Sequence, residues 1–234
     1  MSNVSVEIIP AILESSLDDV SLCLESIKGA SRAVQIDVVD GVYAPNRTWP
    51  YTNAAQQKEF ARIAAQEEGL PFWEDFDFEI DLMVAHPERA VFDWVYAGAS
   101  RIIVHTNSVG ALEALHKLQD MRGELGFGVG IALACSDTSE SLESFSGLYD
   151  FAQVMGIEKV GFQGQDFDSR ALVLLRKLKE KYPDLQLQID GGVGYEHVRE
   201  CADVGATRIT SGSAIFNNDD PRGALRELRA IIKS

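Results

Sequence analysis

The chain has 234 residues, of which 46% are hydrophobic and 24% charged, as expected for one compact domain spanning residues 1–234. Its formal net charge is −15 and no basic patch is visible, which argues against nucleic acid or an acidic membrane surface as a partner. Three isolated cysteines without metal-type spacing, and the lack of a recognisable signal peptide or transmembrane run, predict a cytoplasmic protein.

Short apolar runs rich in strand-forming residues alternate with longer amphipathic stretches along the whole chain. The expected strands are Val6–Leu13, Ala33–Val39, Phe78–Val84, Arg101–Thr106, Phe127–Ala134, Phe151–Gly156, Leu185–Asp190 and Thr207–Ser211. The expected helices are Leu17–Ile27, Ala54–Gln66, Pro87–Ala97, Val109–Met121, Glu140–Leu148, Ser169–Tyr182, Tyr195–Val204 and Arg222–Ile232. Strict strand–helix alternation over this length predicts an α/β fold of the (β/α)8 TIM-barrel type.

An open doubly wound sheet is the alternative to a barrel, but it usually carries a Gly-x-Gly-x-x-Gly turn after its first strand. The corresponding segment here, Ile12-Leu13-Glu14-Ser15, contains no glycine. The longest irregular segment, Gly41–Asn53, follows the second expected strand, at the end where such barrels place their active sites. We expect this segment to be a lid, with an ordinary surface insertion as the alternative.

Three acidic residues, Asp37, Asp81 and Asp190, lie near the carboxyl ends of separate expected strands. Gln35 shares a strand face with Asp37, because alternate residues of a strand point to the same side. Barrel interiors are usually filled by aliphatic side chains, and a buried carboxylate is costly without a partner. The pattern predicts a metal-binding or catalytic site, with hydrogen-bonded or protonated carboxylates as the alternative.

The glycine pair Gly191-Gly192 and the glycine–serine pair Gly212-Ser213 follow the last two expected strands. Glycine lets backbone N–H groups approach an anion closely, and these loops commonly bind phosphate in barrels of this kind. The alternative is that the glycines only allow tight turns.

Three further side chains lie on strands at the same end. Met83 and Met155 share the inward parity of their strands, and would either fill the core or form an apolar wall beside the reacting carbon. His105 ends the fourth strand, and the sequence leaves open whether it contacts a ligand or only packs.

Several short motifs occur together in one order along the chain. They are Pro10-Ala11-Ile12-Leu13, Asp37-Val38-Val39-Asp40-Gly41, Asp81-Leu82-Met83-Val84, Met155-Gly156, Gly161-Phe162-Gln163-Gly164-Gln165, Asp190-Gly191-Gly192-Val193 and Gly212-Ser213-Ala214-Ile215-Phe216. From about Ile9 onward, the sequence resembles the ribulose-phosphate 3-epimerase family. The resemblance implies a barrel of the ribulose-phosphate-binding type and an isomerase of carbohydrate metabolism that epimerises carbon 3 of a ketopentose phosphate.

The resemblance also implies a metal, often zinc, held by two histidines and by two aspartates that act as acid and base. It places these aspartates at Asp37 and Asp190, and the histidines at Gln35 and Asp81, neither of which is a histidine. The resulting set of oxygen ligands favours magnesium or manganese over zinc, unless the metal has been lost.

The phosphate loops of the resembled family are largely retained. The implied substrate- and phosphate-binding residues are Met83, Met155, Gly164, Gly191, Gly192, Gly212 and Ser213. Two departures stand beside them, since the serine of the first motif is replaced by Ala11 and the Pro-Gly-Phe-Gly-Gly motif is reduced to residues 160–164.

Three functions therefore remain open. The first is a divergent sugar-phosphate epimerase, acting on a small phosphorylated sugar and assembled as a homo-oligomer. The second is a non-catalytic phosphosugar-binding barrel that has lost the metal site. The third is a barrel lyase or decarboxylase, which ranks last because Asp37-Val38-Val39-Asp40 lacks the lysine of the Asp-x-Lys-x-x-Asp pattern.

Overall fold

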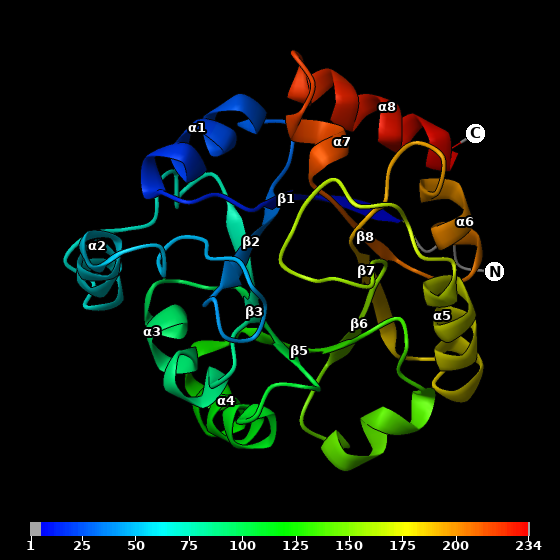
Figure 1. The fold of residues 1–234 in the computed structure, drawn as a ribbon, viewed down its shortest axis with the longest axis horizontal. Coiled ribbons are helices and arrows are strands. Elements are labelled where there is room, and N and C mark those ends of the chain that lie inside the picture. Colours follow the sequence, from blue (N-terminus) through cyan, green and yellow to red (C-terminus); the bar gives the residue numbers. More distant parts are fainter. Residues whose placement is uncertain (1–5, 234) are drawn as a thin grey trace.

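In the computed structural model, which describes residues 6–233, eight parallel strands close into a barrel in sequence order (Figure 1). The strands are β1 (Glu7–Ile12), β2 (Ala33–Val39), β3 (Asp77–Met83), β4 (Arg101–His105), β5 (Gly128–Leu133), β6 (Phe151–Met155), β7 (Gln186–Asp190) and β8 (Arg208–Ser211). Pairing of β1 with β8 completes the barrel, so the TIM-barrel prediction is confirmed and the open sheet is excluded.

The helices form a ring around this barrel (Figure 1). They are α1 (Leu17–Ile27), α2 (Ala54–Ala64), η1 (Pro87–Arg89), α3 (Val91–Tyr96), α4 (Ala111–Leu125), η2 (Ser139–Phe145), α5 (Arg170–Lys181), α6 (Val198–Asp203), α7 (Ser213–Phe216) and α8 (Pro221–Lys233). None of those described is long and apolar enough to cross a membrane.

Several expected helices differ from the structure, and α4 ends at Leu125 instead of Met121. The stretch expected as one helix after β3 divides into the 3₁₀ turn η1 and the short helix α3, and the stretch expected at 140–148 is the 3₁₀ helix η2. The helix expected from Tyr195 begins only at Val198. The four-residue α7 was not expected, because so short a helix leaves no periodic pattern.

The inner and outer faces of a strand differ in polarity, as β2 shows. Val34, Ile36 and Val38 belong to the large apolar core that also includes residues of the surrounding helices. Gln35 and Asp37, on the opposite face, are buried inside the barrel. The alternation predicted from the sequence is therefore correct, and it places the polar side chains of β2 inside the barrel.

The segment Gly41–Asn53 is anchored at its C-terminal half. The Trp49 side chain is fully buried and packs edge-on against Phe60 and Trp94. At the other half, Asn46 Nδ2 donates a hydrogen bond of 2.7 Å to the carbonyl oxygen of Gly161, in the segment that follows β6. These contacts tie the segment to the barrel more closely than expected for an ordinary surface insertion. Its movement as a lid stays a prediction.

Candidate active site

The three acids predicted to converge do so at the carboxyl ends of the strands. Asp37 on β2 lies directly opposite Asp81 on β3, and Asp190 is the last residue of β7. All three are buried, and each offers a carboxylate oxygen within 4.8 Å of the others. Parallel strands brought these residues together from positions up to 153 apart in the sequence (190 − 37).

Burial and mutual repulsion change how this acid cluster ionises. Burial, followed by the charges of Asp190 and Asp81, raises the pKa of Asp37 well above its usual value. Burial, followed by the charge of Asp81, raises the pKa of Asp190 to about 7. The cluster therefore retains a proton near neutral pH and offers an acid and a base side by side.

Each acid is also hydrogen-bonded to other polar side chains inside the barrel. Gln35 Nε2 donates to Asp37 Oδ1 at 2.8 Å and to Asp190 Oδ2 at 2.7 Å, so that one amide bridges the two. Asp81 Oδ1 is hydrogen-bonded to His105 Nε2 at 2.8 Å, and Asp81 Oδ2 accepts from Gln153 Nε2 at 3.1 Å. His105 therefore contacts the acid cluster, while its contact with a ligand stays a prediction.

The acid cluster could hold a metal ion, because three carboxylate oxygens lie close enough together to share one. Oxygen ligands of this kind suit a hard divalent cation. Gln35 is placed among them as predicted, but its amide oxygen is turned away, toward Gln188 Nε2 at 3.1 Å. It presents N–H donors to the acids where a metal ligand would present a lone pair.

A small cavity opens above Asp37 and Asp190. The residues predicted for substrate and phosphate binding all line it: Met83, Met155, Gly164, Gly191, Gly192, Gly212 and Ser213. The two methionines are buried. The structure therefore brings the predicted residues around one cavity, while their roles in binding stay predictions.

The glycine turn after β7 needs its glycines for conformation as well as for space. Gly191 and Gly192 have φ angles of +101° and +69°, which disfavour any other residue. A Cβ on Gly192 would lie 2.9 Å from the Phe167 backbone, and one on Gly191 would lie 2.8 Å from Ile157. The turn thus exposes a backbone bare of side chains to the cavity.

Sequence reasoning did not single out two glutamines of this site. Gln163, in the segment between β6 and α5 that reaches across the barrel mouth (Figure 1), donates to the carbonyl oxygen of Ala11 on β1 at 3.0 Å. Gln153 lies inside the barrel on β6, where it alternates with apolar residues. That alternation could have identified Gln153, and the departure of residues 160–164 from the Pro-Gly-Phe-Gly-Gly motif could have drawn attention to Gln163.

A closed parallel barrel with buried acids beneath a glycine-lined cavity defines the architecture of a TIM-barrel enzyme. Among solved structures, the chain is similar to KGPDC from Streptococcus mutans, with a TM-score of 0.72, 13% identity and 97% of each chain covered. It is also similar to 3-hexulose-6-phosphate synthase from Salmonella typhimurium, with a TM-score of 0.69, 16% identity and coverage of 97% and 99%. At these identities the likeness shows the shared fold alone.

Sequence comparison narrows this class to one family. The model of the ribulose-phosphate 3 epimerase family matches residues 7–216. The ribulose-phosphate 3-epimerase of Eremothecium gossypii is 31% identical over 97% of this chain and 92% of its own, and that of Aquifex aeolicus is 27% identical over 89% and 88%. The chain belongs to the ribulose-phosphate 3-epimerase family, whose named members are isomerases of sugar phosphates.

Proposed function

We propose that the protein is an isomerase that epimerises a ketopentose phosphate, or a related ketose phosphate, at carbon 3 through an enediolate. The observation that carries this proposal is the buried pair Asp37 and Asp190, which come from separate strands, β2 and β7, and border one cavity. Membership of the epimerase family supports it. A non-catalytic phosphosugar-binding barrel is less favoured, because it would have no use for two buried acids crowded beside the cavity.

In this mechanism the two acids exchange protons with opposite faces of one carbon. The ionised member of the pair removes the proton next to the ketone, and the protonated member returns a proton from the other side. The raised pKa values of Asp37 and Asp190 support such a division, because one proton is retained between them near neutral pH. Asp81 contributes by its charge, which raises both pKa values.

The glycine-rich rim would hold the phosphate group. We assign this role to backbone groups of Gly164, Gly191, Gly192, Gly212 and Ser213, which line the cavity beside the acids. The Met83 and Met155 side chains would pack against the carbon chain and keep water from the enediolate. The chain's own net charge of −15 makes such local donors necessary for an anionic substrate.

Any divalent cation at this site would be held by Asp37, Asp81 and Asp190. These ligands favour magnesium or manganese over zinc, since the set contains no thiolate or free imidazole. When bound, such an ion supplies positive charge at the substrate's ketone oxygen. Gln35 would join the set only with its amide turned over.

The wider setting of the protein stays a prediction. The family implies a small phosphorylated sugar as the substrate. Homo-oligomeric assembly and a cytoplasmic location are expected but not tested by the structure.

Solvent exchange tests the proposed reaction directly. Ribulose 5-phosphate and related ketose phosphates in deuterated water should gain deuterium at carbon 3, measured by NMR with magnesium, manganese or chelator present. Asp37→Asn should slow epimerisation at carbon 3, followed in the same NMR samples, by about 10³-fold, because it removes the proton carrier on one face of that carbon. Asp120→Asn, an exposed acid on α4, is the matched control and should exchange at the wild-type rate. The proposal is refuted if none of the ketose phosphates gains deuterium at carbon 3.

A further inference from the structure

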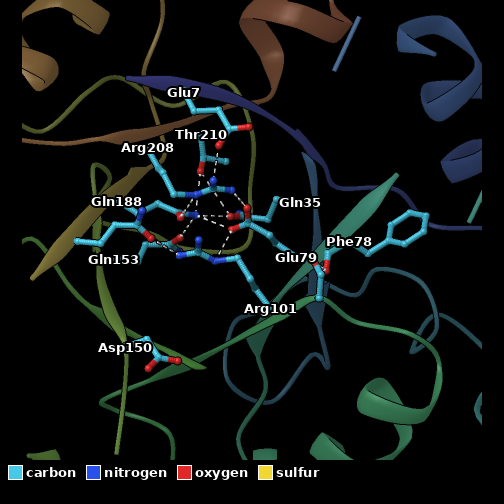
Figure 2. Close-up of polar contacts among 12 residues, drawn as sticks. Glu7, Gln35, Phe78, Glu79, Arg101, Asp150, Gln153, Gln188, Arg208 and Thr210 are labelled. Carbon is cyan, nitrogen blue, oxygen red and sulfur yellow. Dashed lines mark hydrogen bonds and ion pairs between the residues drawn. The ribbon is translucent and has the colours of Figure 1, made fainter. Parts of the chain in front are cut away.

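Buried polar side chains are hydrogen-bonded to one another inside the barrel (Figure 2), and Gln35 and Gln153 join this group to the acid cluster. Arg208 Nε, on β8, donates to Gln188 Oε1, on β7, at 3.2 Å. Gln188 Nε2 donates to Gln35 Oε1 at 3.1 Å. Gln35 Nε2 then donates to Asp37 and Asp190 at 2.8 and 2.7 Å.

A second branch reaches the remaining acid. Gln188 Nε2 also lies 2.9 Å from Gln153 Oε1, and Gln153 Nε2 donates to Asp81 at 3.1 Å. The three glutamines are completely buried, and Arg208 is 7% exposed. We use the name donor relay for Arg208, Gln188, Gln35 and Gln153, because each of them donates a hydrogen bond to the next residue toward the acid cluster.

The direction of the donor relay is fixed at both ends. A guanidinium group carries only donors, so Gln188 must turn its oxygen toward Arg208 and its nitrogen upward. At the upper end, Gln35 must turn its nitrogen toward the acids, because the ionised member of the Asp37–Asp190 pair only accepts, and Gln153 turns its nitrogen to Asp81 Oδ2. If one of these amides turned over, donors would face donors and acceptors would face acceptors. Each polar group left unsatisfied in this way would lower the folding stability by about 1–3 kcal/mol.

The lower end of the donor relay is itself held in place. Arg208 forms ion pairs with Glu79 of β3 and Glu7 of β1 (Figure 2). Glu79 Oε2 and Thr210 Oγ1, each 3.3 Å from Gln188 Nε2, further favour nitrogen on that side of the Gln188 amide. Arg208 therefore cannot swing away without leaving buried charges unpaired.

We propose that this donor relay, and not a bound metal ion, holds the two proton-transferring acids in place, with Gln35, Gln153 and Gln188 as positioning residues. The inference rests on the proposed epimerase function and concerns the same site. A cation shared by Asp37 and Asp190 would compete with the Gln35 amide that already bridges them. To serve as a ligand, Gln35 would have to turn over and give up its contact with Gln188.

Metal content and exchange are measured first on the wild-type protein. After dialysis against a chelator, elemental analysis should find no stoichiometric metal, and deuterium exchange into ribulose 5-phosphate should change by less than about twofold. Titration with Mn²⁺, followed by electron paramagnetic resonance, should show only weak binding. Exchange that stops on chelation and returns with one equivalent of metal would overturn the proposal.

The variant Gln35→Glu replaces the donating amide of the relay by a carboxylate of nearly the same shape. A fourth carboxylate replaces the bridging donors, so the variant should bind one Mn²⁺ at least about 100-fold more tightly than the wild type. Its metal-free exchange should fall by about 100-fold. The matched control is Gln186→Glu, on the same strand as Gln188 but exposed, which should match the wild type in both measurements.

The variant Gln188→Met tests the relay without adding charge. Gln35 and Gln153 would lose the donor that orients them, so kcat should fall about 10-fold at unchanged KM. Mn²⁺ affinity should rise, because the freed Gln35 oxygen can turn toward the acids. This variant decides the question should Gln35→Glu fail to fold, as judged by circular dichroism.

The outcomes separate this inference from the proposed function. Wild-type protein that catalyses no exchange with or without added metals refutes the epimerase proposal. In that case the Mn²⁺ titrations of the wild type and the two variants still test the donor relay. Wild-type Mn²⁺ binding as tight as that of Gln35→Glu, or no gain in Gln188→Met, refutes the relay.

Discussion

The two halves of the barrel interior are both polar and buried, yet they balance charge in different ways. In the lower half, Glu79 forms an ion pair with Arg208 and lies 3.6 Å from Arg101 Nε (Figure 2). In the upper half, three carboxylates share only amide donors and one imidazole. A carboxylate beside a guanidinium is held in its charged form, whereas crowded carboxylates compete for protons. The lower half therefore stabilises the barrel, and the upper half keeps its acids reactive.

The largest effect is expected where the upper half loses one acid. Asp190→Asn should slow epimerisation of ribulose 5-phosphate by at least about 10³-fold, because the proton carrier on one face of carbon 3 is removed. The same change should raise the free energy of unfolding by about 1–3 kcal/mol, since it removes a buried like charge. Urea unfolding and an NMR assay of the two epimers measure the two effects. A variant that loses both activity and stability would remove the contrast between the halves.

The lower half should respond in the opposite way. Glu79→Ala leaves the buried Arg208 without its interior partner and should lower the free energy of unfolding by about 3–5 kcal/mol. The control is Asp77→Ala, on the same strand as Glu79. It breaks an exposed ion pair with Arg32 and should lower the free energy of unfolding by less than about 1 kcal/mol. Equal effects of the two substitutions would show that the buried pair does not support the barrel.

The pH dependence of stability sharpens the comparison. Asp190 has a pKa of about 7 in the folded protein, against about 3.9 in an unfolded chain, so only the folded state holds its proton between these values. As pH rises through that window, the wild type should lose stability relative to Asp190→Asn, by at most about 1.4 kcal/mol per pH unit. The difference should be level below pH ~4 and again above pH ~7. Urea unfolding of chelator-treated protein at several pH values measures it, and a difference independent of pH contradicts the assignment.

The smallest effect is expected at the rim. Gly192→Ala puts a side chain at a φ of +69° and against the Phe167 backbone, which should cost about 1–2 kcal/mol of folding free energy. It should also raise KM for the phosphorylated sugar. Gly123→Ala, in α4 with open space around it, is the control and should stabilise the protein slightly. An unchanged KM in Gly192→Ala would show that this turn does not hold phosphate.

The barrel and its acid cluster could be predicted because both follow from local rules. Alternation of strands and helices defines the barrel, and parallel strands deliver Asp37, Asp81 and Asp190 to one end. The direction of the Gln35 amide could not be predicted in this way. It depends on Arg208, which lies 173 residues away along the chain (208 − 35) and acts through Gln188.

Hydrogen bonds between residues far apart in the sequence were the other feature that the sequence did not predict. Gln163 crosses the barrel mouth from an irregular segment, where sequence spacing says nothing about direction. The role of His105 could be narrowed only once Asp81 was seen 2.8 Å away. Long-range hydrogen bonds of this kind are properties of the closed barrel and not of any one strand.

The uneven anchoring of the segment Gly41–Asn53 has a practical consequence. Its second half contains the fully buried Trp49, whereas Val42 in its first half is 73% exposed beside the barrel mouth. Val42 and Pro45 are exposed, whereas Ala44 between them is 4% exposed and packs with Val39 and Met83. A library confined to Val42 and Pro45 is therefore the natural starting point for redirecting the protein toward other ketoses, because it leaves the packing beneath intact.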